Sequence, residues 1–121
     1  MKTIELSVAR DFSRTPGSRY RDEGDFSGEE FREELLQPAV KQALVERSQL
    51  HVNLDGTAGY GTSFLEEAFG GLVRSSGFTG PELLAVLRFT SKEEVYLVED
   101  ILGYINDAEQ VRATRSPAGA W

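Results

Sequence analysis

Residues 50–72 restrict the fold of this chain more than any other segment. The segment begins with alternating apolar and polar side chains, which is the period of a half-buried strand. The turn signal Asp55-Gly56 follows, and apolar residues then recur at helical spacing. Gly70 and Gly71 lie inside this helical pattern and indicate close backbone packing, since each weakens a helix by up to about 1 kcal/mol. The segment therefore predicts one strand and one helix of an α/β fold.

Thr62 and Ser63 are predicted to lie at the start of that helix, directly after the glycine-rich turn. Backbone N–H groups converge at a helix start and favour negative charge there, so both hydroxyls are candidate phosphate acceptors or anion contacts. Ser63 and Glu66 also have the spacing of a capping box, and this structural role alone explains both residues. Glu66 and Glu67 would repel a phosphate placed in the same turn.

The part of the chain before the central strand is expected to hold a strand, a long loop and a helix. Residues 3–8 alternate apolar and polar side chains and predict the opening strand. Residues 11–27 are polar and rich in turn formers, which predicts a loop. Ser27 and Glu30 have capping-box spacing in front of an apolar helical stripe. Pro38 then predicts either a kink or the first turn of a second helix.

A strand, a helix and a tail are expected after the central helix. Residues 83–89 predict a short buried strand, with helix as the alternative for the first of them. Ser91 and Glu94 form another capping-box pattern before an apolar stripe, and this helix is expected to end near Asn106. Residues 109–121 lack apolar periodicity and predict a flexible tail.

Strands and helices that alternate along the chain predict the α/β class. We expect a small mixed or partly parallel sheet covered by about three helices. The length of 121 residues fits one domain, which we place at residues 1–108, with the tail at 109–121.

The composition argues against several classes of function. A net charge of −7 does not favour nucleic acid or anionic membranes as partners, because both attract a basic surface. The chain has no cysteine and one histidine, His51, so we expect no catalytic residue, no metal site and no cofactor. No apolar run has the length of a membrane span, and the N-terminus lacks the apolar core of a signal peptide. We therefore expect a cytoplasmic protein.

Arg14, Arg19 and Arg21 crowd the predicted N-terminal loop and are candidate anion-binding residues. Guanidinium groups bind phosphate and carboxylate groups in bidentate fashion. The alternative is a solvated loop in which nearby carboxylates balance the arginines. If the loop folds over the start of the Thr62 helix, the arginines, the glycine amides and the helix dipole would converge on one anion.

Five short motifs carry a resemblance to a known family. They are Thr15-Pro16-Gly17, Arg19-Tyr20, Ser27 to Arg32, Asp55-Gly56-Thr57 and Tyr60 to Leu72. Together they make the chain resemble a STAS-like domain family of unknown function over residues 3–107. The resemblance implies a STAS-like α/β fold.

That family is distantly similar to the STAS domains of bacterial anti-sigma-factor antagonists. In those domains the strand-helix junction reads Asp-Ser-Ser-Gly, and a partner kinase that is also the anti-sigma factor phosphorylates the first hydroxyl. Here the junction reads Gly61-Thr62-Ser63-Phe64, so the resemblance places Thr62 at the phosphorylated position. Gly61 stands in place of the aspartate and Phe64 in place of the glycine. The resemblance also implies a GHKL-type ATPase or kinase as the partner.

These observations together predict a noncatalytic regulatory or adaptor domain that binds another protein. Tyr60 and Phe64 bracket the two hydroxyls and are candidate partner-binding residues, since exposed aromatic side chains are typical interface anchors. Burial of both rings is the structural alternative. A phosphate or a bound anion at Thr62 or Ser63 would switch the binding. Two other functions stay open: a phosphate-ligand-binding domain or enzyme that uses the arginine loop, and a phage or defence accessory protein that inhibits a partner complex.

Overall fold

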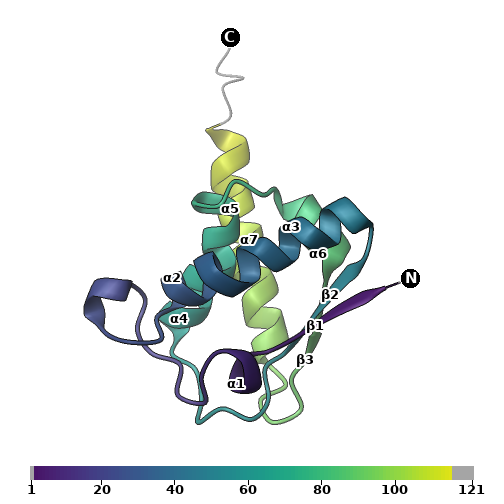
Figure 1. Ribbon diagram of the computed structural model, residues 1–121. Coiled ribbons are helices and arrows are strands. Elements are labelled where there is room, and N and C mark those ends of the chain that lie inside the picture. The colour runs from purple at the N-terminus through teal and green to yellow at the C-terminus, as the bar shows by residue number, and fades with distance from the viewer. Residues whose placement is uncertain (1, 116–121) are drawn as a thin grey trace.

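The computed structural model describes residues 2–115, which form three strands and a series of helices (Figure 1). Helix η1 is a 3₁₀ turn, and η2 and η3 are π-helical turns inside longer helical runs. In chain order the elements are β1 (Thr3–Ser7), α1 (Val8–Asp11), η1 (Arg21–Glu23), α2 (Gly28–Phe31), η2 (Arg32–Leu36), α3 (Gln37–Glu46), β2 (Gln49–Asn53), α4 (Thr62–Leu65), η3 (Glu66–Gly70), α5 (Gly71–Arg74), α6 (Gly80–Val86), β3 (Leu87–Thr90) and α7 (Leu97–Thr114).

The three strands form one wholly parallel sheet in the order β1-β2-β3. Crossovers between parallel strands are right-handed, and in this strand order they place both helical connections on the same face of the sheet. Figure 1 shows the helices gathered on one side of the strands. Leu50 of β2 and Leu87 of β3 are paired in register and belong to the buried core. The predicted α/β class and the small sheet covered by helices are thus confirmed.

His51 joins the three strands through its side chain. Its Nδ1 lies 2.6 Å from Oε1 of Glu5 on β1, and its Nε2 lies 2.6 Å from Oγ1 of Thr90 on β3. Successive side chains of a strand point to opposite faces, so His51 lies on the face opposite the buried Val52. The imidazole therefore bridges both neighbouring strands across the polar face of the sheet.

The helical run from α2 through α3 begins as the sequence predicts. The hydroxyl of Ser27 accepts a hydrogen bond of 3.0 Å from the backbone N–H of Glu30. In the π turn η2, the N–H of Gln37 donates to the carbonyl of Arg32, five residues back. Pro38 follows in the first turn of α3, as the second predicted alternative has it, but the backbone of Leu36 and Gln37 is helical, so the two helices form one run instead of two that meet at a break. Because proline has no N–H, a change of hydrogen-bond register just before it removes the conflict with a regular helix.

Residues 83–86 are helical, which confirms the alternative predicted for the first part of residues 83–89, and the strand is limited to residues 87–90. The hydroxyl of Thr79 accepts from the N–H of Glu82 at 3.2 Å, and the carboxylate of Glu82 accepts from the N–H of Thr79 at 2.9 Å. This capping box starts α6 at Gly80, so only residues 87–90 remain for β3. A short apolar run cannot by itself distinguish a strand from a buried helix.

The predicted limits of the last helix are wrong. Ser91 does not cap it: its hydroxyl donates to the carbonyl of Glu94, and α7 starts at Leu97. The helix continues past Asn106 to Thr114, so the domain boundary predicted at residue 108 falls inside it. Glu109 attaches the extension to α6, since its carboxylate accepts a 2.8 Å hydrogen bond from the N–H of Gly80. Residues 116–121 of the predicted tail lie outside the described part of the chain.

Candidate functional site

Thr62 and Ser63 lie at the start of the helical run α4-η3-α5, as the sequence predicts. Thr62 is the first helical residue and is exposed, whereas Ser63 is half-buried. The predicted capping box of Ser63 and Glu66 is wrong. Gly61 takes the N-cap position with extended backbone, and no side chain caps the helix. The helix begins at Thr62, one residue before the predicted cap residue Ser63, so Ser63 already lies inside the first turn.

Phe64 has no exposed surface, so its predicted role as an interface anchor is wrong for this conformation. Its ring packs against Phe31 and Tyr60, with centroid separations of 5.9 Å in both pairs. The hydroxyl of Tyr60 donates to the carbonyl of Leu54 at 2.7 Å, and burial raises the pKa of this phenol. Both rings therefore hold the glycine-rich turn against the core beneath the exposed Thr62.

The N-terminal loop does pack beside the strand-helix junction. The N–H of Ala58 donates to the carbonyl of Arg14 at 2.8 Å, which ties the loop to the glycine-rich turn. Gly28 lies so close to α4 that a Cβ atom there would be 2.4 Å from the carbonyl oxygen of Phe64. The loop and the start of α2 thus form one wall of the junction.

The three candidate arginines of the loop do not form a common anion cradle. Arg19 reaches the helical run of Thr62, where its guanidinium pairs with the carboxylate of Glu66. The guanidinium of Arg21 instead pairs with Glu33 at 3.0 Å and with a second glutamate of η2. Arg14 is exposed and has no carboxylate within 4.0 Å among residues 2–115. Two of the three guanidinium groups are therefore neutralised by acidic side chains of the chain itself.

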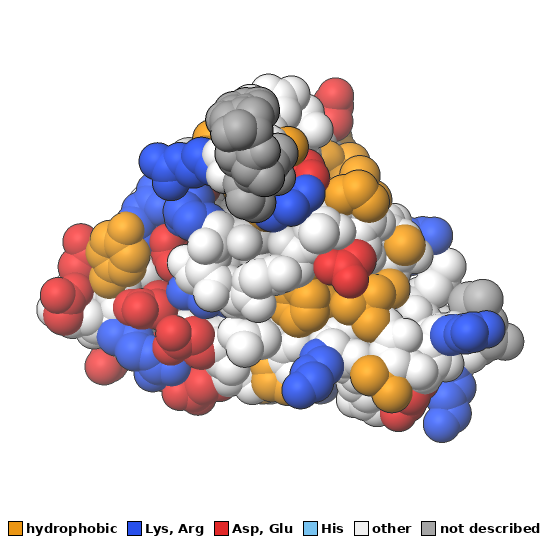
Figure 2. Space-filling view, turned by 90° about the horizontal axis from the view of Figure 1, so that it is seen from above, with side chains coloured by type: hydrophobic (Ala, Val, Ile, Leu, Met, Phe, Trp, Pro, Cys, Tyr) orange, Lys and Arg blue, Asp and Glu red, His pale blue; other side chains and the backbone are white. Residues whose placement is uncertain are grey.

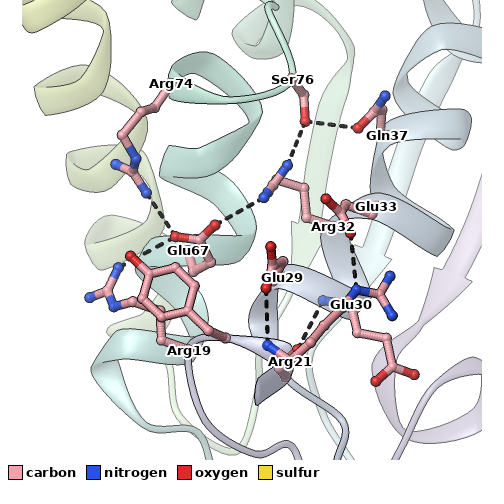
Figure 3. A network of polar contacts seen from close by, with 12 residues as sticks. Arg19, Arg21, Glu29, Glu30, Arg32, Glu33, Gln37, Glu67, Arg74 and Ser76 are labelled. Carbon is pink, nitrogen blue, oxygen red and sulfur yellow. Dashed lines mark hydrogen bonds and ion pairs between the residues drawn. The ribbon is translucent and has the colours of Figure 1, made fainter. Parts of the chain in front are cut away.

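Glu67 is the centre of a buried ionic network that the sequence analysis missed (Figure 3). Its Oε2 accepts a 2.9 Å hydrogen bond from Nη2 of Arg32, and both side chains are only 4% exposed. On the other side, Arg74 lies 3.1 Å and Arg19 lies 3.6 Å from Oε1 of Glu67. Arg32 also donates to the hydroxyl of Ser76 at 3.0 Å. The only sequence signal was the predicted close packing at Gly71, where a Cβ would lie 2.6 Å from Nε of Arg32.

Glu66 belongs to the same network. Its two carboxylate oxygens accept hydrogen bonds of 2.9 and 3.1 Å from Arg74, in addition to the contact with Arg19. Burial alone would raise the pKa of Glu66, but the hydrogen bonds from Arg74 and Arg19 outweigh it and lower the pKa. Three guanidinium groups thus face the two carboxylates of Glu66 and Glu67. The repulsion that these carboxylates would exert on a phosphate at Thr62 is therefore offset.

A metal site and a membrane-spanning helix each place specific requirements on the described residues. Among residues 2–115, no three His, Asp or Glu side chains come close enough together to bind a metal ion. None of the helices in this range combines the length and the apolar character needed to cross a membrane. On the face in Figure 2, acidic and basic side chains intermix at one end, and hydrophobic side chains form small separate patches.

The comparisons with known proteins agree with the fold. Residues 27–96, more than half of the chain, match the family model described as a STAS-like domain of unknown function (DUF4325). The match includes the first helical run, β2, the Thr62 junction and β3. No curated protein and no solved structure matches the chain. The sheet has three parallel strands with helices on one face, and the family match spans the strand-helix junction. The chain therefore belongs to the STAS-like domain family of unknown function.

Proposed function

We propose that this chain is a noncatalytic regulatory domain that binds a partner protein through the surface around Thr62. Phosphorylation of Thr62 or Ser63 weakens this binding. The observation that carries the proposal is the exposed hydroxyl of Thr62 in the first turn of a helical run whose nearby carboxylates are paired with arginines. Thr62 is the stronger candidate of the two hydroxyls, because Ser63 is half-buried.

The local electrostatics suit a phosphate at this position. A phosphate group carries about −1.5 to −2 charges at neutral pH, and the first turn of a helix favours negative charge. Glu66 and Glu67 are neutralised by Arg19, Arg32 and Arg74, so they offer little repulsion. The added charge therefore leaves the fold intact and changes what the surface can bind.

The structure of the junction also suits a switch at the surface. Tyr60 and Phe64 pack into the core, and the hydrogen bond from Tyr60 to Leu54 holds the turn that precedes Thr62. A rigid turn presents Thr62 in one position, so a partner can dock there without ordering the chain first. The partner class that we propose is a GHKL-type ATPase or kinase, as the family resemblance implies.

The alternative of a phosphate-ligand domain built on the arginine loop has less support. Arg19 and Arg21 are bound to glutamates of the helical runs, and a ligand would have to displace these carboxylates. Of the three loop arginines, only Arg14 has no ion pair with a residue in the range 2–115, and one exposed guanidinium contributes little binding energy.

Phosphorylation assays test the proposal. The chain is incubated with ATP and a purified GHKL-type ATPase, and the modified residue is located by tandem mass spectrometry. We expect phosphate on Thr62 or Ser63, and we expect Thr62→Val to lower its incorporation. Thr114→Val is the matched control, because Thr114 is an exposed threonine at the far end of α7. Phosphate on neither residue would refute the switch, and an interface at the junction would then be tested by binding alone.

A further inference from the structure

A groove of about 400 Å³ lies away from the ionic network, where α3 and α6 end and β2 begins. Alanine, leucine and valine side chains of α3 and α6 form its apolar walls. Arg47, which follows α3, and Arg88 of β3 add two guanidinium groups. The volume lies at the lower end of the range of small-molecule sites, which is roughly 300–1,000 Å³.

The two arginines of the groove have no acidic partner. Among residues 2–115, no carboxylate lies within 4.0 Å of Arg47 or Arg88, whereas Arg19, Arg21 and Arg32 all have ion pairs. Nη1 of Arg88 donates to the carbonyls of Leu87 and Leu84 at 2.6 and 3.3 Å, which fixes the guanidinium in place. No described residue accepts a hydrogen bond from its Nε or Nη2.

The helix ends beside the groove reduce this positive charge without cancelling it. A helix C-terminus carries about half a negative elementary charge, and α3 and α6 both end here. Arg47 and Arg88 each carry a full positive charge. The groove therefore keeps an excess of positive charge next to apolar walls.

Ser48 adds a buried polar group without a partner. The residue lines the groove and is only 3% exposed, and within the described chain its hydroxyl has no hydrogen-bonding partner. A buried hydroxyl left without a partner is unfavourable. The hydroxyl oxygen exposes less than 1 Å² of surface, so it lies behind the wall of the groove and a ligand does not contact it directly.

From the apolar walls and the two arginines without an acidic partner we propose a second ligand site, distinct from the Thr62 junction, which binds a small anion with an apolar body. The apolar part occupies the walls formed by α3 and α6. The anionic head, a carboxylate or a phosphate, contacts Arg47 and Arg88. Charge alone or apolar surface alone gives only part of the binding energy, so the site selects molecules that carry both.

Four probes test this site in the full chain by titration followed by NMR of the backbone amides. Phenyl phosphate and benzoate carry both parts, inorganic phosphate carries only the charge, and phenol carries only the ring. We expect both ring-bearing anions to bind at millimolar concentration and to shift the amides of Ser48, Gln49 and Arg88. The other two probes should bind at least about tenfold more weakly. The stronger of the two ring-bearing anions identifies the preferred head group.

Variants locate the site. The double substitution Arg47→Gln/Arg88→Gln should weaken binding at least about tenfold. Arg14→Gln is the matched control, since Arg14 is another exposed arginine without an ion pair in the described chain, and it should leave binding unchanged. Ala85→Leu fills the groove from α6 without changing any charge and should also abolish binding. Equal binding of inorganic phosphate, equal loss in Arg14→Gln, or no binding of either ring-bearing anion would overturn the proposal.

Discussion

Arg32 and Glu67 form an ion pair of 2.9 Å in which both side chains are 4% exposed. Arg32 is the first residue of the π turn η2, and Glu67 is the second residue of the π turn η3. The pair thus joins the two helical runs at the places where both depart from regular α-helical geometry. Figure 3 shows Arg32 on one side of Glu67, with Arg19 and Arg74 on the other. The network therefore connects the N-terminal loop with both helical runs, the second of which begins at Thr62.

Loss of the Glu67 carboxylate from this buried pair should strongly destabilise the fold. Glu67→Gln leaves the buried guanidinium of Arg32 without a carboxylate, which costs roughly 3–5 kcal/mol. Arg32→Met removes the shortest of the three ion pairs of Glu67 and should cost less, because Arg74 and Arg19 remain beside the carboxylate. Glu33→Gln is the control, because Glu33 pairs with Arg21 at the surface and an exposed pair contributes at most about 1 kcal/mol. Urea unfolding measures the free energy of unfolding of each variant. Equal losses would show that the buried pair contributes no more to stability than the surface pair.

Gly28→Ala should destabilise the packing of α2 on α4. The new Cβ would lie 2.4 Å from the carbonyl oxygen of Phe64, and backbone atoms cannot move away cheaply, so we expect a loss of about 1–3 kcal/mol. Gly103→Ala is the matched control, since no atom lies within 4 Å of its added Cβ. This second substitution in helix α7 should stabilise by up to about 1 kcal/mol. Thermal unfolding measures the melting temperature of both variants. Equal shifts would contradict the close approach of Gly28 to the carbonyl group of Phe64.

Removal of a hydroxyl should lower the stability of the fold more at Thr79, which caps α6, than at Ser63, which does not cap α4. Thr79→Ala removes the cap of α6 and should cost about 1 kcal/mol. Ser63→Ala should cost less than about 0.5 kcal/mol, because Gly61 holds the N-cap position of α4 and Ser63 lies inside the helix. Denaturant midpoints of the two variants give the comparison. A larger loss of stability for Ser63→Ala than for Thr79→Ala would show that Ser63 caps the helix, as the sequence predicts.

Acid should weaken the contact between α6 and α7. Hydrogen bonds from Arg112 and from the N–H of Gly80 lower the pKa of Glu109 from its ordinary value of 4.5 to about 2. A carboxylate with a lowered pKa in the folded state stabilises fully above its ordinary pKa, and this contribution is lost as the pH falls from 4.5 towards 2. Glu109→Gln should therefore flatten the fall of the melting temperature in this pH window. Glu99→Gln, an exposed site on α7, is the control and should leave the slope unchanged.

The fold was predictable from the sequence where local patterns are strong. Neighbouring residues decide the alternation in β1 and β2, the cap at Ser27 and the position of Pro38 in the first turn of α3. The limits of the last helix were not predictable in this way. Past Asn106 the helix contacts α6 through the hydrogen bond between Gly80 and Glu109, and such a contact between distant residues leaves no periodic signal.

The candidate site was predictable in position but not in its contacts. The strand, the glycine-rich turn and the two hydroxyls place Thr62 at a helix start, as the structure confirms. The burial of Phe64 depends on Phe31, a residue of a different helix. The pairing of Arg19 with Glu66 likewise joins residues 47 positions apart. Charge and aromatic character alone do not reveal whether such side chains face the solvent or each other.

The most direct test of the proposed function is the dissociation constant of the complex between this chain and its partner protein. We predict that Thr62→Glu, which adds negative charge at the start of α4, raises this constant at least about tenfold. Thr62→Ala should bind as the wild type does, and so should Thr114→Glu, which places the same charge at the end of α7. Unchanged affinity of Thr62→Glu would contradict the account and place the interface elsewhere.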